Sequence, residues 1–193
     1  MSGIYLLGLI AIWLFVGWLI HRFWRNAIVI RDFNKIAHYA LGGVLFLVWF
    51  GSGFWAFAGK KMYYDVQVRE MCAKDGGITV FETVELPAEM FNRWGQPNFY
   101  NQTLGEDALG QEYIFRKEIK YYRKQDPAVS RRSYRVIRKS DNKLIGESVV
   151  YGRGGGDLPG PWQGSNYRCP VNGGDIPLLV KVFKSSTKGL IDE

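Results

Sequence analysis

The chain has 193 residues, of which 47% are hydrophobic, and it carries a formal net charge of +7. A single domain usually has about 100–150 residues, so this length allows one domain and one further segment. The two histidines, His21 and His38, both lie in the apolar N-terminal part. The polar remainder is thereby excluded from enzyme classes that use a Ser-His-Asp or Cys-His arrangement and from His-based zinc sites. We predict no cofactor and no metal.

Two long runs without Asp, Glu, Lys or Arg open the sequence, the 18 residues Gly3–Ile20 and the 24 residues Ile36–Gly59. A helix rises about 1.5 Å per residue, so each run is long enough to span roughly 30 Å of hydrocarbon. A cleaved signal peptide is the alternative for the first run, but no basic segment precedes it and no small-residue cleavage site follows it. A buried helix of a soluble core is the alternative for the second run. The sequence predicts a hairpin of two transmembrane helices, residues 3–20 and 36–59, joined by a connector, residues 21–35.

Basic residues in the connector predict how this hairpin is oriented. The connector contains Arg22, Arg25, Arg31 and Lys35 against one acidic residue, Asp32. Short loops rich in Lys and Arg remain in the cytoplasm, so we expect the connector there and both chain ends outside. Four more basic residues follow the second span, but long domains cross the membrane largely regardless of their charge.

The two cysteines, Cys72 and Cys169, stand apart from each other and from any Cys-x-x-C motif. A domain outside the cytoplasm is in an oxidising space, where two cysteines tend to pair. A disulfide closing so long a loop would stabilise the fold by about 4–5 kcal/mol in the chain-entropy model. Two buried, reduced thiols in a cytoplasmic domain are the alternative.

The polar part of the sequence is predicted to be α+β. Residues 60–75 are expected to form a helical stalk, and residues 76–193 a β-rich domain. Alternation of apolar and polar residues predicts a strand over residues 78–87, and the following Pro and acidic residue predict a short helix. Further strands are expected at residues 112–124, 131–139, 144–152 and 176–183, with a long Gly-rich surface loop at 152–170. The predicted fold class is a membrane-anchored α+β protein, in which a two-helix transmembrane hairpin precedes a small, mainly antiparallel β-sheet domain with one or two short helices.

Basic residues are concentrated between Arg116 and Lys143, where eleven bases stand against three acids. Such a region can bind an acidic protein, an anionic lipid or an anionic polymer, and nucleic acid is the least expected ligand outside the cytoplasm. A solvated basic face without a ligand is the alternative. The residues predicted to contact a partner are Arg131, Arg132, Arg135, Arg138, Tyr134, Arg153, Trp162 and Tyr167.

Several sequence stretches resemble a known kind of protein. After the two apolar runs come CAKDGG and VFETVELP, then YRVIRKSDNKLIGESVVYGRGGGD, and finally YRCP. This order resembles uncharacterised small inner-membrane proteins of proteobacteria, whose periplasmic domain opens with Cys-x-Lys-Asp-Gly-Gly and closes with Cys-Pro. The resemblance implies an inner-membrane location with the N-terminus and the C-terminal domain in the periplasm, and it implies no activity.

The sequence therefore predicts a non-enzymatic binding protein anchored in the lipid bilayer. Its expected partner is another envelope protein, with the chain acting as an accessory subunit of a complex or as an immunity-type protein. One alternative is an envelope hydrolase that uses carboxylates such as Glu85, Glu89 or Asp157 without histidine. Another is a binder of anionic lipid or polymer through residues 116–143.

Overall fold

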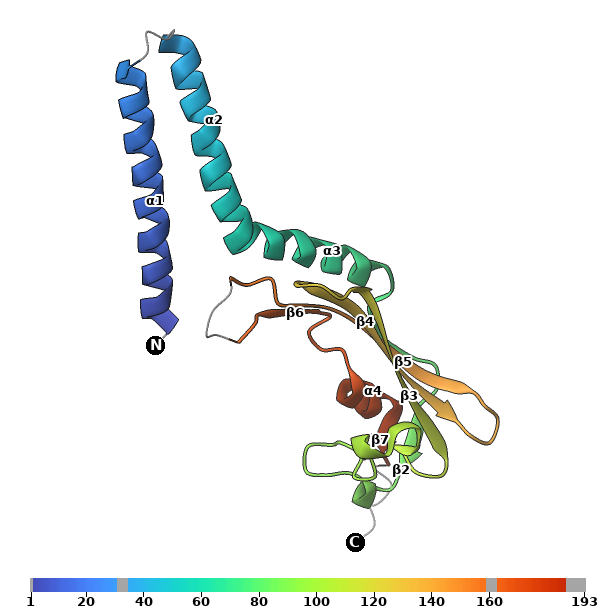
Figure 1. Ribbon diagram of the computed structural model, residues 1–193. Coiled ribbons are helices and arrows are strands. Elements are labelled where there is room, and N and C mark those ends of the chain that lie inside the picture. Colours follow the sequence, from blue (N-terminus) through green and yellow to red (C-terminus); the bar gives the residue numbers. More distant parts are fainter. Residues whose placement is uncertain (1, 31–34, 159–162, 187–193) are drawn as a thin grey trace. The chain divides into compact units, whose positions relative to one another are not determined.

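A computed structural model of the protein describes residues 2–30, 35–158 and 163–186 (Figure 1). The fold is α+β, and the chain forms two compact units. The helical unit comprises Met1–Met62 together with Gly156–Ser165, and the sheet unit comprises Tyr63–Gly155 together with Asn166–Glu193.

The helical unit begins with two long apolar helices, α1 (Ser2–Ile30) and α2 (Lys35–Phe54). One turn of π-helix, η1 (Trp55–Gly59), follows, and α3 (Lys60–Asp75) begins directly after it and belongs to the sheet unit from Tyr63 onward. The helix α1 continues to Ile30, ten residues beyond the end of the predicted span at Ile20 and into the predicted connector. No Gly or Pro occurs between His21 and Ile30, so nothing in the sequence ends the helix earlier.

Three pairs of tryptophan and glycine join α1 to α2. A Cβ atom added to Gly17 would lie 3.2 Å from Nε1 of Trp49, and one added to Gly42 would lie 3.2 Å from Nε1 of Trp24. The third pair, Trp13 with Gly53, has a closest distance of 3.1 Å. From one pair to the next, the residue number in α1 rises by as much as the residue number in α2 falls, which is the pattern of an antiparallel alignment. The glycines let the indole rings approach the backbone of the opposite helix, as small residues do between membrane helices.

Within the part of the chain that the structure describes, two helical runs are long and apolar enough to cross a membrane, the 24 residues Gly3–Asn26 and a longer run that begins at Tyr39. Their side chains are exposed instead of packed in a protein core, as Ile4 at 79% and Leu47 at 69% illustrate. Water is a poor solvent for so large an apolar surface. This weakly indicates that the protein is associated with a membrane.

A five-stranded antiparallel sheet forms the centre of the sheet unit. Its strands are β1 (Gly77–Val80), β3 (Tyr113–Arg123), β4 (Ala128–Arg138), β5 (Leu144–Gly154) and β6 (Asn166–Cys169). The order is β1-β5-β4-β3, and β6 also pairs with β5, one strand length beyond β1. The strand β3 is therefore one edge of the sheet, while β1 and β6 together line the other side of β5.

The strand predicted over residues 78–87 is two strands in two sheets. After β1, the backbone N–H groups of Phe81 and Glu82 both donate to the carbonyl of Ile145, at 2.9 and 3.1 Å, so the ladder stops there. The chain then forms β2 (Val84–Leu86), which pairs in parallel with β7 (Phe183–Ser185). Two 3₁₀ turns follow β2, η2 (Ala88–Met90), where a short helix was predicted, and η3 (Gln102–Asp107).

The apolar run at residues 176–183 was predicted to be a strand, and this was wrong. It forms the helix α4 (Asp175–Val182), and only Phe183 continues into β7. The acidic Asp175 stands in the first turn, where the helix dipole favours a negative charge. Leu178, Leu179 and Val182 are completely buried, which this run achieves as a helix because these three positions share one side of it. The predicted loop at 152–170 also contains a strand, β6.

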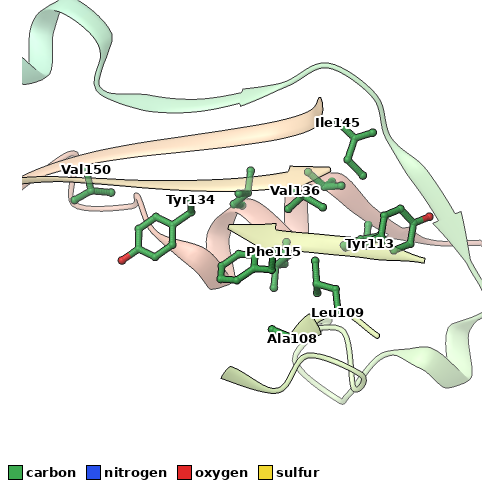
Figure 2. Packing of buried hydrophobic residues seen from close by; sticks show 12 residues of the cluster. Ala108, Leu109, Tyr113, Phe115, Tyr134, Val136, Ile145 and Val150 are labelled. Atoms are coloured by element: carbon green, nitrogen blue, oxygen red, sulfur yellow. The ribbon is translucent and has the colours of Figure 1, made fainter. Parts of the chain in front are cut away.

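The main core lies between α4 and one side of the sheet, which we call the α4 face (Figure 2). Phe115 of β3, together with Tyr134 and Val136 of β4, lies on this face, and Ile145 adds a further completely buried side chain. Full burial of such a side chain stabilises a fold by roughly 1.5–3 kcal/mol, so this cluster is the main source of stability for the sheet unit. A Cβ atom on Gly146 would collide with Val182, which explains the glycine at that position.

Candidate binding surface

The opposite side of the sheet, which we call the α3 face, is occupied by α3 (Figure 1). Val68 and Cys72 of α3 pack there with Val149 and Tyr151 of β5. Cys72 and Cys169 form a disulfide across a sequence separation of 97 residues, with their Cα atoms 5.9 Å apart. The predicted pairing of the two cysteines is therefore confirmed.

Ion pairs add to this attachment of α3. Nε of Arg153 lies 2.6 Å from Oδ1 of Asp65, and the arginine side chain is only 4% exposed. Arg131 donates to Asp75 at 3.1 Å, and the hydroxyl of Tyr151 donates to the same carboxylate at 2.7 Å. Burial of Tyr151 and this hydrogen bond to Asp75 raise the pKa of the phenol well above its usual range. These arginines are thus engaged in holding α3 in place.

Most of the basic residues on the α3 face and in the β4–β5 hairpin have acidic partners. Arg135 donates to Glu147 at 2.8 Å, and Arg116 donates to Glu106 at 3.0 Å. In the hairpin, Glu82 accepts from Arg138 and from Lys143, and Lys139 pairs with Asp107 at 2.7 Å. A surface pair of this kind contributes about 0–1 kcal/mol, but each one neutralises a base that would otherwise attract an anion.

The α4 face differs, because beyond α4 it carries three bases with no carboxylate within 4 Å among the described residues. These are Lys117 of β3, Arg132 of β4 and Arg168 of β6. The strand registers place them on one side of the sheet, because Ile119 lies opposite Arg132 and Gly152 lies opposite Arg168. The only described contact of Lys117 with a charged or aromatic group is with the ring of Tyr134, at 6.0 Å.

Apolar side chains complete this surface. Ile119 and Tyr121 of β3 are 43% and 51% exposed, on the same face as Lys117. Ser130 of β4 lies opposite Gly152 of β5, and Gly152 lies opposite Arg168 of β6. Gly152 has no side chain that would stand beside Arg168 on this surface. Strands are about 4.8 Å apart and residues about 3.3 Å, so Arg132 and Arg168 lie roughly 10–12 Å apart at the backbone, within common reach of one ligand. We call Lys117, Ile119, Tyr121, Arg132 and Arg168 the cationic surface.

The predicted contact residues have different environments in the structure. Tyr134 is 7% exposed and belongs to the core, and Arg153 is buried against Asp65, so neither presents its side chain to a partner. Tyr167 is half-buried in the cluster beneath α3, and Trp162 lies outside the described residues. The remaining candidates are Arg131, Arg135 and Arg138, which have acidic partners, and Arg132, which alone belongs to the cationic surface.

Lys117, Ile119, Tyr121 and Arg168 were not among the candidates. Alternation along β3 places Lys117, Ile119 and Tyr121 on one face, and this signal was available in the sequence. Arg168 joins them only because β6 pairs with β5, and the Gly-rich stretch before it gave no strand pattern.

A charged pair also lies among the described residues of the helical unit. Lys61 lies 2.9 Å from Asp157, beside a hollow of about 370 Å³ that is also lined by Gly3, Leu6 and Phe57. Burial raises the pKa of Asp157, but hydrogen bonds from Ser165 and from Lys61 outweigh it and hold the pKa near 2. Asp157 was a candidate acid for hydrolysis, and a carboxylate so strongly held in its ionised form is poorly suited to donate a proton near neutral pH.

Comparison with protein-family models, with curated proteins and with solved structures finds no match to this chain. The likeness to proteobacterial inner-membrane proteins therefore remains a hypothesis from the sequence. The cationic surface has to be interpreted from its own geometry.

Proposed function

We propose that this chain is a membrane-anchored binding protein of the bacterial envelope. In this proposal α1 and α2 cross the inner membrane as a hairpin, and the sheet unit lies in the periplasm. The cationic surface binds an acidic segment of another envelope protein. The observation that carries the proposal is that Arg131, Arg135 and Arg153 of the α3 face have carboxylate partners, whereas none of the three bases of the cationic surface has one among the described residues.

An acidic protein segment suits this surface better than a lipid bilayer does. Each basic residue near an anionic membrane contributes about 1 kcal/mol, so three unpaired bases would give only weak attraction to lipid. Their neighbours Ile119 and Tyr121 are apolar and stand on the strand beside Arg132. A peptide that alternates acidic and apolar side chains satisfies both kinds of group at once.

The binding test uses a photo-crosslinking residue in place of Val171, which is 81% exposed and lies two residues after Cys169. The full chain is irradiated in intact cells. We expect a protein adduct whose linked segment is acidic, and about fivefold less adduct when Arg132→Ala is added, because an unpaired cation is lost. Arg135→Ala is the matched control on the same strand, since Arg135 is already paired with Glu147, and it should leave the yield within twofold.

Equal adduct in the Arg132→Ala and Arg135→Ala chains would contradict the proposed surface. Adducts with lipid alone would favour the anionic-lipid alternative instead. The location is tested separately with reporters fused after Glu193. Alkaline phosphatase should be active there and a fluorescent protein that matures only in the cytoplasm should stay dark, and the opposite result would reject the orientation.

A further inference from the structure

The outer edge of β3 is open over seven residues. Arg116 to Tyr122 are all exposed, and β3 pairs only with β4 among the described strands. The backbone groups of such an edge can pair with another strand, and proteins usually prevent this with charged side chains. The order of the charged side chains along β3 determines which strand can pair with this edge.

We propose that two copies of this chain pair through their β3 edges, antiparallel, with Ile119 of one copy opposite Ile119 of the other. This inference goes beyond the proposed function, because it concerns pairing between two copies and does not depend on a ligand, although it shares Lys117, Ile119 and Tyr121 with the cationic surface. The result is one continuous sheet of two five-stranded halves.

In this register the charges of β3 complement themselves. Glu118 of each copy lies opposite Lys120 of the other, which gives two pairs of opposite charge on one face. On the other face Lys117 lies opposite Tyr121 of the second copy, which allows two contacts between a cation and an aromatic ring. At the centre, two exposed isoleucines, each 43% exposed, cover each other.

Registers shifted by one or two residues lack these pairs of opposite charge. A shift of one residue toward the N-terminus places Lys117 opposite Lys120, and a shift of two places Glu118 opposite Glu118. A shift of two in the other direction places Lys120 opposite Lys120. A parallel arrangement in register puts every charge opposite its own copy. Like charges directly opposite each other are destabilising, so the sequence of β3 favours one alignment.

The side chains needed for these pairs are available. Glu118 is 61% exposed, and its nearest base, Arg135, is 3.9 Å away and lies closer to Glu147, at 2.8 Å. Lys120 has no carboxylate within 4 Å among the described residues, and its described contact is with the ring of Tyr122, at 5.5 Å. The pairing of β3 with β4 shifts register between Tyr121 and Arg123. An irregularity of this kind disrupts the ladder, so we expect the pairing of the two copies to end there.

Cysteine crosslinking of the full chain in native membranes tests the register. The native cysteines are bonded to each other, so one introduced cysteine supplies a free thiol. Ile119→Cys should form a covalent dimer on mild oxidation, because the two sulfurs meet at the two-fold axis. Lys117→Cys alone should not, since its two copies lie about 13 Å apart, but a mixture of Lys117→Cys and Tyr121→Cys chains should crosslink.

Charge exchange tests the energetics in the full chain in detergent, by light scattering across a dilution series. Glu118→Lys and Lys120→Glu should each weaken the dimer by about tenfold or more, because two attractive pairs become repulsive. The double variant should regain wild-type affinity, although it still lacks the Glu118 contact with Arg135. A monomeric wild-type chain, crosslinking at Lys117→Cys as strong as at Ile119→Cys, or no recovery in the double variant would overturn the proposal. The intact native disulfide of each variant shows that it has folded.

Discussion

At the scale of single residues, the partner of each base matters more than its position in the basic region. Arg153 and Arg132 lie on neighbouring strands, yet Arg153 is buried beside Asp65 and Arg132 has no acidic partner among the described residues. Removing the acid from a buried pair leaves an uncompensated charge and costs about 3–5 kcal/mol, so Asp65 and Arg153 act together in holding α3. Arg132 is free of that constraint and is available to a ligand.

Glu82 allows a prediction about pH at the same scale. Hydrogen bonds from Lys143 and then from Arg138 lower the pKa of its carboxyl below the ordinary 4.5, although burial opposes this. A lowered pKa in the folded state means that the stabilisation is fully present above pH 4.5 and is lost as the pH falls through the folded-state pKa. We expect Glu82→Gln to lower the urea midpoint of the full chain by a constant amount above pH 4.5 and by progressively less below it.

The measurement is pulse proteolysis in urea at a series of pH values. Glu85→Gln is the matched control, because Glu85 is exposed on β2 and has no ion pair among the described residues. A difference between wild type and Glu82→Gln that stayed the same down to pH 2 would show that the carboxylate charge is not what stabilises the β4–β5 hairpin.

At the scale of elements, sequence patterns predicted the strands with clear boundaries and failed where tertiary contacts decide. The β3, β4 and β5 strands were predicted to within three residues of the bounds that the structure gives them. The run at residues 176–183 fits a buried strand or a buried helix equally well by composition, and its packing against Gly146 selects the helix. The short β6 obtains its backbone hydrogen-bond partners from β5, so the local sequence alone does not predict it.

Two neighbouring glycines of α2, Gly42 and Gly43, allow a test of how α1 packs on α2. Gly42 faces Trp24, so Gly42→Val should push the indole ring away and destabilise the packing of α1 on α2 by about 1–3 kcal/mol. A Cβ atom added to Gly43 would have no neighbouring atom within 4 Å, so Gly43→Val is the control and should change little. The check is the melting temperature of the full chain in mild detergent, and equal melting temperatures for the two variants would reject the tryptophan–glycine alignment.

At the scale of the whole molecule, the sequence was sufficient for the apolar helices, the α+β class and the disulfide, and insufficient for the binding surface. Charge density pointed to residues 116–143 as a group. It could not show that Arg131, Arg135 and Arg138 have acidic partners, because those partners, Asp75, Glu147 and Glu82, come from other elements. The bases without acidic partners can be identified only once the pairing of the strands and the neighbouring elements are known.

The disulfide links this scale to the compartment that we propose. Closing a loop across 97 residues restricts the unfolded chain, so replacing both Cys72 and Cys169 with Ala should lower the free energy of unfolding by about 4–5 kcal/mol. Pulse proteolysis of the full chain in urea measures this loss, and reductant should produce a similar loss in the wild type and none in the double variant.

In intact cells both thiols should resist a membrane-permeant maleimide until the protein is reduced and unfolded, because an oxidising space keeps them paired. Labelling without reductant would place the sheet unit in a reducing compartment and contradict the proposed orientation, while leaving the pairing of β3 edges open to its own test.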